Sequence, residues 1–214
     1  MKKTYKYILL DWDGNMINTL PIWLEGYRKC AKYFHKKFSD KFIVKNLFGN
    51  LHAYKLYGVD TREEFDKKLL EEFVNPELKK ASLFPKVLTT VKKLRERGAK
   101  IAVVSSSKRN IVEYGLKRFG IDKLIEALVA SDDVKNHKPH PESLLKAMNL
   151  IGANIEETVI VGDGEKDTLA GQAIGIDTIL YYPKINHLIY SRKTINLLNA
   201  TYVVESFDEI LIIF

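Results

Sequence analysis

Short apolar runs recur along most of the chain, and between them the apolar residues follow a helical spacing. Runs of this length with little polar alternation are typical of strands that are buried on both faces. They predict strands at residues 7–10, 101–104, 128–130, 158–161, 178–181 and 201–204. The intervening stripes, with apolar residues three and four positions apart, predict helices that connect these strands. Strands that alternate with helices predict an α/β fold with a parallel sheet covered by helices on both faces.

The segment of residues 21–84 has a different pattern, because aromatic residues and lysines are frequent in it and its apolar spacing is mostly helical. Apolar stripes at residues 23–34 and 65–73 advance in steps of three and four. The regions around residues 49–50 and 59–60 read as breaks between helices. We therefore expect a small unit of several helices here.

Prolines and glycines mark the expected helix ends after this segment. Pro85 and Pro141 stand where helices are expected to begin, with Pro85 as a first helical residue. Gly98, Gly120 and Gly175 follow the last apolar positions of three helical stripes. These signals place the helix boundaries between the predicted strands.

The chain has 214 residues, of which 46% are hydrophobic and 29% charged, as is ordinary for a globular protein. This length allows one sizeable core and a smaller accessory unit. No apolar stretch approaches the roughly 18 residues of a membrane span, and the apolar run near the start turns acidic too soon for a secretory signal. The single cysteine, Cys30, fits a small buried residue in a reducing compartment. We expect a cytoplasmic protein with no membrane partner.

The formal net charge is +7, from 34 basic and 27 acidic residues. A basic balance is compatible with nucleic acid, an anionic membrane or small phosphorylated substrates. The lysines are scattered, in pairs such as Lys36–Lys37 and Lys92–Lys93, where helical faces meet solvent. This scatter favours a solvated surface and disfavours a nucleic-acid partner.

Two carboxylates, Asp11 and Asp13, come directly after the first predicted strand, and Gly14 follows them. Residues two apart in an extended segment point the same way, so both carboxylates share one small volume. Two like charges at this distance require a cation or a shared proton. A calcium-binding EF-hand loop is excluded, because Met16 and Ile22 stand where it needs glycine and a carboxylate. The remaining readings are a metal site, an acid/base pair or an ordinary solvated turn.

Polar clusters also follow the next three predicted strands. They are Ser105-Ser106-Ser107-Lys108, the segment 137–142 with Lys138, and the segment 162–167 with Asp163 and Asp167. The carboxyl ends of parallel strands meet at one edge of a sheet, where ligands bind. Together with the two leading aspartates, these clusters supply the parts of a phosphoryl-transfer site.

The carboxylates divide into reacting groups and metal ligands. Asp11 is the candidate nucleophile, because a carboxylate can form an aspartyl-phosphate. Asp13 is the candidate general acid and base. Hard oxygen ligands suit magnesium, and Asp163 would join Asp11 in binding it. Asp167 would hold a metal-bound water or a neighbouring lysine.

The phosphoryl oxygens need donors and positive charge. The Ser105 hydroxyl is the candidate donor, and backbone N–H groups near Ser106 and in the turn 12–14 would complete the cradle. Lys138 is the candidate cation, with Lys135 as the alternative at this stage.

The four clusters in this order resemble the haloacid dehalogenase superfamily of phosphohydrolases, on Asp11-Trp12-Asp13-Gly14, Ser105, Lys138-Pro139 and Gly162-Asp163-x-x-x-Asp167. The resemblance covers nearly the whole chain and is strongest to the phosphoglycolate phosphatase and β-phosphoglucomutase branch. It implies a Rossmann-like three-layer core from residues 1–15 and 85–214, with a helical cap inserted at residues 16–84. It also implies magnesium and an aspartyl-phosphate intermediate.

Within that resemblance, an acid at position 13 favours a phosphatase or phosphomutase over a dehalogenase. Asp13 is expected to meet the ion through its backbone carbonyl, which makes the implied metal set Asp11, Asp13, Asp163 and Asp167. Asn15 departs from the threonine or valine that is frequent in the family. We expect this departure to have a small effect, with altered pairing between core and cap as its alternative.

The leading hypothesis is a magnesium-dependent phosphatase that acts on a small phosphorylated metabolite. The alternatives are a sugar-phosphate mutase, a phosphate-binding protein without catalysis, and a nucleic-acid end phosphatase. Substrate contacts are expected from Asn18, Trp23 and Arg28 and from the loop that holds Gly49 and Asn50. The substrate and the oligomeric state are not predicted.

Overall fold

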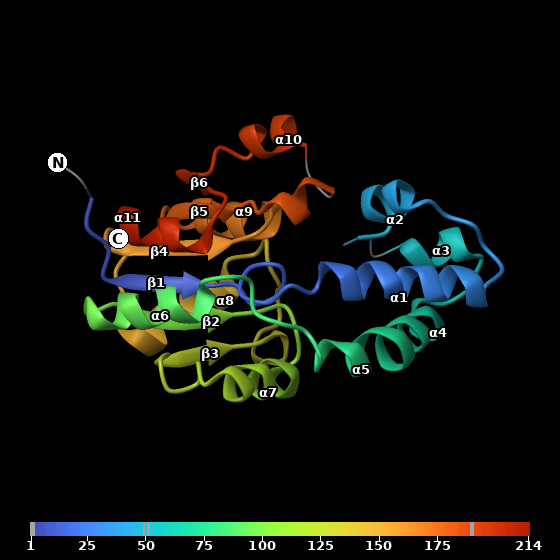
Figure 1. Ribbon diagram of the computed structural model, residues 1–214, viewed down its shortest axis with the longest axis horizontal. Helices are drawn as coiled ribbons and strands as arrows, with labels where there is room; N and C mark the ends of the chain where they lie inside the picture. Colours follow the sequence, from blue (N-terminus) through green and yellow to red (C-terminus); the bar gives the residue numbers. More distant parts are fainter. Residues whose placement is uncertain (1–2, 49, 51, 189–190) are drawn as a thin grey trace. The chain divides into compact units, whose positions relative to one another are not determined.

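A computed structural model describes residues 3–48, 50, 52–188 and 191–214 (Figure 1). Its contacts divide the chain into two compact units. The first contains the chain up to Asn18 and from Leu83 onward, and the second is Thr19–Ser82. Ile17 pairs with Leu83 in an isolated β-bridge, and Phe84 N–H donates to Met16 O at 3.0 Å. These contacts keep both connecting segments in the first unit.

The first unit is built on a six-stranded parallel sheet in the order β3-β2-β1-β4-β5-β6. The strands are β1 (Tyr7–Leu10), β2 (Lys100–Val104), β3 (Ala127–Val129), β4 (Thr158–Gly162), β5 (Asp177–Tyr181) and β6 (Tyr202–Val204). All six predicted strands are therefore present. Strand β1 lies between β2 and β4, with Leu9 opposite Ala102 on one side and Ile160 on the other.

Helices cover both faces of this sheet, which confirms the Rossmann-like α/β architecture. They are α6 (Val87–Glu96), α7 (Arg109–Phe119), α8 (Glu142–Ile151), α9 (Glu165–Ala173), α10 (Arg192–Leu197) and α11 (Ile210–Ile213). Apolar side chains of α8 and α9 pack on one face, against Leu9, Ala102 and Ile160. Alternate residues such as Ile8 and Val103 therefore point to the other face, which α6 crosses (Figure 1).

The helix that was expected to begin at Pro85 begins two residues later. Lys86 precedes helix α6 with φ of 68°, a left-handed conformation that cannot belong to the helix. Pro85 therefore lies in the turn before the helix, and this part of the prediction is wrong. The glycine signal holds for α7, since Gly120 follows it with φ of 67°.

The second unit is helical throughout its described elements. They are α1 (Leu20–Tyr33), α2 (Asp40–Asn46), α3 (Ala53–Tyr57), α4 (Arg62–Asp66), a π-helix (Lys67–Val74) and α5 (Asn75–Leu78). Tyr57 OH donates to Tyr27 O, and Tyr27 OH donates to Leu47 O, each at 3.1 Å. Cys30 is buried beside this chain of hydrogen bonds, and burial raises the pKa of its thiol to about 12. Cys30 is thus a core residue, as expected.

The order of the strands decides where a site can lie in the first unit. The chain leaves β1 for β2 on one side and later returns to β4 on the other. The loops that follow β1 and β4 therefore diverge from neighbouring strand ends, and in such sheets ligands bind at this carboxyl edge. No helix in the described part of the chain combines the length and apolar character of a membrane span.

Candidate active site

Asp11 stands at the first position beyond β1 and is 5% exposed. Its N–H donates to Val161 O at 2.9 Å, which continues the sheet pairing for one residue past the strand. The chain then turns sharply, because the N–H groups of Met16 and Ile17 both donate to Trp12 O at 3.0 Å. This turn holds the Asp11 side chain at the carboxyl edge of the sheet.

The side chain of Asn15 connects the same turn to the neighbouring strand β4 by hydrogen bonds. Its Nδ2 donates to Asp11 O at 2.9 Å and to Val161 O at 3.2 Å, and the residue is fully buried. These two carbonyls belong to the segments that carry Asp11 and Asp163. Asn15 therefore positions the backbone of the site, a role that the sequence alone did not reveal.

Lys138 reaches the same edge from the loop that precedes α8. Its Nζ donates to Asp11 Oδ1 and Asp167 Oδ1, both at 2.6 Å, and to Val104 O at 3.0 Å. The side chain of Lys138 is 4% exposed, whereas Lys135 is an exposed residue. Of the two candidate lysines, the structure therefore brings Lys138 to the carboxylates.

Asp11, Asp163 and Asp167 form a group of three carboxylates. Each offers an oxygen, and these atoms all lie within 4.8 Å of one another. Carboxylate oxygens at this spacing are the ligands that a hard divalent cation such as magnesium prefers. The carboxylate of Asp13 is not one of the three, so its contribution to a metal site through the backbone carbonyl stays a prediction.

The directions of the pKa shifts of these groups indicate negative charge that Lys138 does not fully compensate. Burial, reinforced by the charge of Asp167, raises the pKa of Asp163 to about 8, although Lys138 works in the opposite direction. Burial likewise raises the pKa of Asp11, against the opposing effect of Lys138. Burial alone would lower the pKa of Lys138, but Asp11 and Asp167 outweigh it and hold that pKa above its ordinary value. A divalent cation would remove this imbalance, so the residues fit the ion.

Gly14 is the residue that allows the two strand ends to come this close. It adopts φ of 78°, in the left-handed region that favours glycine. A Cβ atom at this position would overlap the carboxylate of Asp163. The glycine of the Asp-x-Asp-Gly segment is therefore required both by its backbone conformation and by its neighbour.

Asp13 lies beside the three carboxylates and is held from the β2 loop. Ser107 Oγ donates to Asp13 Oδ2 at 2.6 Å, and Ser105 Oγ lies 3.4 Å from the same oxygen. Asp13 is near enough to Asp163 to contribute to the raised pKa of that carboxylate. Ser105 is buried and Ser106 exposed, so their side chains meet different surroundings on one loop.

Ser107 was not singled out from the sequence, although its segment was. The signal was available, because residues 105 and 107 lie two apart beyond a strand, as Asp11 and Asp13 do. Two hydroxyl groups of such a pair can point to one volume. In this loop both lie within 3.4 Å of one oxygen of Asp13.

Two residues that were expected to contact the substrate, Arg28 and Asn50, form hydrogen bonds within the second unit. Arg28 donates from Nη2 to Asp40 Oδ2 at 2.6 Å and from Nε to Asp40 Oδ1 at 2.9 Å. The amide of Asn50 donates to Asn46 O at 2.8 Å. Both side chains support the local fold, and their role in substrate binding stays a prediction.

The other expected contacts are placed as follows. The Trp23 ring lies 6.4 Å from that of Tyr27, centroid to centroid, in the second unit. Asn18 is half-buried at the end of the leading segment of the first unit. Gly49 lies outside the described residues. For all of these, contact with a substrate also stays a prediction.

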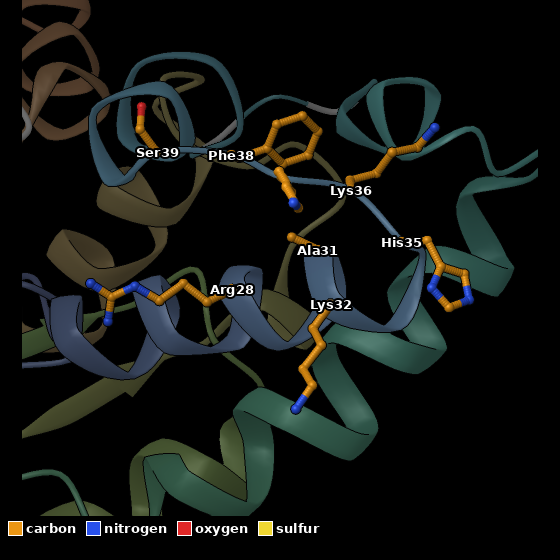
Figure 2. Close-up of a pocket in the computed structure, with 8 residues that line it drawn as sticks. Arg28, Ala31, Lys32, His35, Lys36, Phe38 and Ser39 are labelled. Atoms are coloured by element: carbon orange, nitrogen blue, oxygen red, sulfur yellow. The ribbon is translucent and has the colours of Figure 1, made fainter.

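The second unit contains an open hollow of about 700 Å³ between the end of α1 and the start of α2 (Figure 2). It is lined by Arg28, Ala31, Lys32, His35, Lys36, Lys37, Phe38 and Ser39. The charged ends of Arg28, Lys32 and Lys36 point in three different directions (Figure 2). These three cations do not converge on one point, whereas the carboxylates of the first unit and Lys138 do, so the carboxylate group is the candidate active site.

Comparisons with known proteins identify the family of the chain. A family model described as haloacid dehalogenase-like hydrolase matches residues 8–181. The pyrophosphatase PpaX of Halalkalibacterium halodurans is 32% identical over 95% of this chain and 94% of its own. Crystal structures of a predicted phosphoglycolate phosphatase from Haemophilus somnus and of a HAD family hydrolase from Deinococcus radiodurans both have TM-scores of 0.79. The H. somnus structure is 22% identical, and the match covers 98% of this chain and 97% of that protein. The D. radiodurans structure is 19% identical, and the match covers 97% of this chain and 94% of that protein. At these identities the two structures support the fold.

Proposed function

Because the chain belongs to the haloacid dehalogenase-like hydrolase family, we propose that it is a magnesium-dependent phosphatase for a small phosphorylated metabolite. The observation that carries the proposal is the convergence of Asp11, Asp163 and Asp167 with the buried ammonium group of Lys138. Negative carboxylates and a cation in one buried volume supply both a nucleophile and the charge that a phosphoryl group requires.

The reaction consists of two transfers. An oxygen of Asp11 attacks phosphorus, the bond from phosphorus to the leaving oxygen breaks, and Asp13 gives that oxygen a proton. Water then attacks the aspartyl-phosphate, Asp13 takes the proton of the water, and inorganic phosphate leaves with Asp11 restored. The Asp13 carboxylate is available for this work because it is not one of the three carboxylates that group together.

Several of the remaining residues would together neutralise the negative charge of the phosphoryl group. Asp11, Asp163 and the backbone carbonyl of Asp13 would hold magnesium, and Asp167 would hold a metal-bound water or Lys138. When bound, the ion supplies positive charge to the phosphoryl oxygens. Lys138 adds a second charge, and the hydroxyl of Ser105 and backbone N–H groups near Ser106 donate hydrogen bonds.

The helical unit is proposed as the cap of this enzyme. A cap excludes water while the phosphoryl group is on the nucleophile and supplies contacts for the substrate. Asn18, Trp23, Arg28 and Asn50 are the proposed contact residues, together with Gly49. The cytoplasm is the proposed location, in keeping with the single buried thiol of Cys30.

Asp11→Asn tests the proposal directly. An amide is a poor nucleophile, so release of phosphate from 4-nitrophenyl phosphate should fall below detection, while circular dichroism and thermal melting show a folded protein. Asp60→Asn is the matched control, because it makes the same chemical change at an exposed position. Turnover that persists in Asp11→Asn, or that is absent from the unmodified protein with magnesium, would refute the proposed mechanism.

Inorganic pyrophosphate is a second candidate substrate, because the relative from H. halodurans is named a pyrophosphatase and aligns over nearly the whole chain. A panel of pyrophosphate, phosphoglycolate and hexose phosphates, each with and without magnesium, separates the candidates. Preferred hydrolysis of pyrophosphate would support this substrate. Formation of a hexose phosphate isomer in place of free phosphate would instead support a mutase.

A further inference from the structure

The shortest hydrogen bond to the Asp13 carboxylate among those described comes from Ser107. The distance from Ser107 Oγ to Asp13 Oδ2 is 2.6 Å, within the range of a hydroxyl that donates to a charged carboxylate. The distance from Ser105 Oγ to the same oxygen is 3.4 Å, beyond the usual range for two oxygens. Ser107, rather than the more deeply buried Ser105, therefore makes the stronger contact with the candidate acid/base.

The backbone of Ser107 is fixed on both sides. Its N–H donates to Ser105 Oγ at 3.0 Å, and its carbonyl accepts from Ser131 N–H at 3.0 Å. Ser131 begins a short 3₁₀-helix that follows β3, so the loop after β2 is tied to the next strand along the sheet. A hydroxyl on a backbone held in this way loses little further freedom when it binds Asp13.

A serine hydroxyl can serve Asp13 in both of its protonation states. The hydroxyl donates to the carboxylate when Asp13 is ionised, and its oxygen can accept when Asp13 carries the proton. The same contact can thus be kept while Asp13 gives a proton to the leaving oxygen and later takes one from water. An alanine at this position would leave Asp13 without this restraint.

We infer that Ser107 is a positioning residue, which holds the Asp13 carboxyl group where it meets the oxygen of the leaving group. This inference rests on the proposed function, because it needs Asp13 as the proton donor. It assigns Ser107 a part in the first transfer step, while the Asp11 nucleophile and the carboxylate group keep their places.

The consequence is a dependence on the leaving group. 4-Nitrophenolate leaves readily without a proton, whereas the alkoxide of 4-nitrobenzyl alcohol needs one. General acid catalysis contributes about a hundredfold to ten-thousandfold where the proton is needed. Ser107→Ala should therefore lower kcat for 4-nitrobenzyl phosphate about tenfold or more beyond its effect on 4-nitrophenyl phosphate, with KM nearly unchanged.

Two further variants make the comparison specific. Ser107→Thr keeps a hydroxyl and should restore most of the turnover of 4-nitrobenzyl phosphate. Ser131→Ala removes a hydroxyl from the segment that holds the same loop by its backbone, and should leave both substrates unaffected. Thermal melting of each variant shows whether it is folded at the assay temperature.

The outcomes separate the inference from the proposed function. Equal losses on both substrates in Ser107→Ala, no loss on either, or a rise in KM alone would overturn the role of Ser107 and leave the phosphatase intact. Failure of the unmodified protein to hydrolyse either phosphomonoester would overturn the proposed function, and the role of Ser107 with it.

Discussion

At the scale of single residues, Asn15 shows how a buried amide can shape a site that it does not enter. Its Nδ2 donates to the carbonyl of Asp11, just beyond β1, and to that of Val161, near the end of the neighbouring β4. From the sequence we expected a small effect of Asn15, with altered pairing between core and cap as the alternative. In the structure, the Asn15 side chain instead joins the backbone that carries Asp11 to the strand that leads to Asp163.

Asn15→Ala should lower the free energy of unfolding by about 1–3 kcal/mol, because it removes two hydrogen bonds from a buried position. Urea unfolding followed by circular dichroism measures this loss. Asn149→Ala is the control, because this asparagine is exposed on α8 and should change stability by less than about 0.5 kcal/mol. Similar values for the two variants would contradict the role of Asn15.

At the scale of elements, the positions of strands and helices followed from local patterns, whereas their exact contacts did not. Continuous apolar runs are read from neighbours in sequence, and every run that was predicted as a strand is one. The start of α6 was misplaced, because the left-handed conformation of Lys86 depends on the turn in which it lies. Close helix packing is also decided in three dimensions, as Gly115 on α7 illustrates.

Gly115→Ala should destabilise the protein although it improves the helix propensity of α7. The propensity gain is about 1 kcal/mol, but a Cβ at Gly115 would overlap the ring of Trp12, and overpacking costs about 1–3 kcal/mol. We expect a net loss in stability, measured by urea unfolding, and lower turnover because Trp12 lies between Asp11 and Asp13. Lys117→Ala, on the exposed part of the same helix, should be nearly neutral. A more stable Gly115→Ala protein would show that the ring of Trp12 can move.

At the scale of the whole molecule, the charge of the site links folding to pH and to metal. The pKa of Asp163 is about 8 in the folded chain without metal, against about 4 for an unfolded aspartate. Between these values the folded state holds more protons than the unfolded state, so stability falls as the pH rises. A bound divalent cation favours the ionised carboxylate and reverses this disadvantage.

The melting temperature with a chelator should therefore decrease from about pH 4 towards about pH 8. With magnesium it should decrease less, so the stabilisation by magnesium should grow with pH. Thermal melting at several pH values, with chelator and with magnesium, measures both trends. Asp163→Asn should weaken both the pH trend and the magnesium effect, while the raised pKa of Asp11 should preserve part of the trend. A magnesium effect that does not vary with pH would contradict this account.

The sequence by itself determined the class of fold, the family and the identity of the polar clusters at the strand ends. These features are local, because strand periodicity and short motifs are complete within a few neighbouring residues. Only the tertiary structure decided that Lys138 rather than Lys135 meets Asp11, and that Ser107 and Asn15 support the site. The physical reason is that a hydrogen bond acts over about 3 Å between groups that the fold must first bring together, and that distance cannot be read from the order of residues.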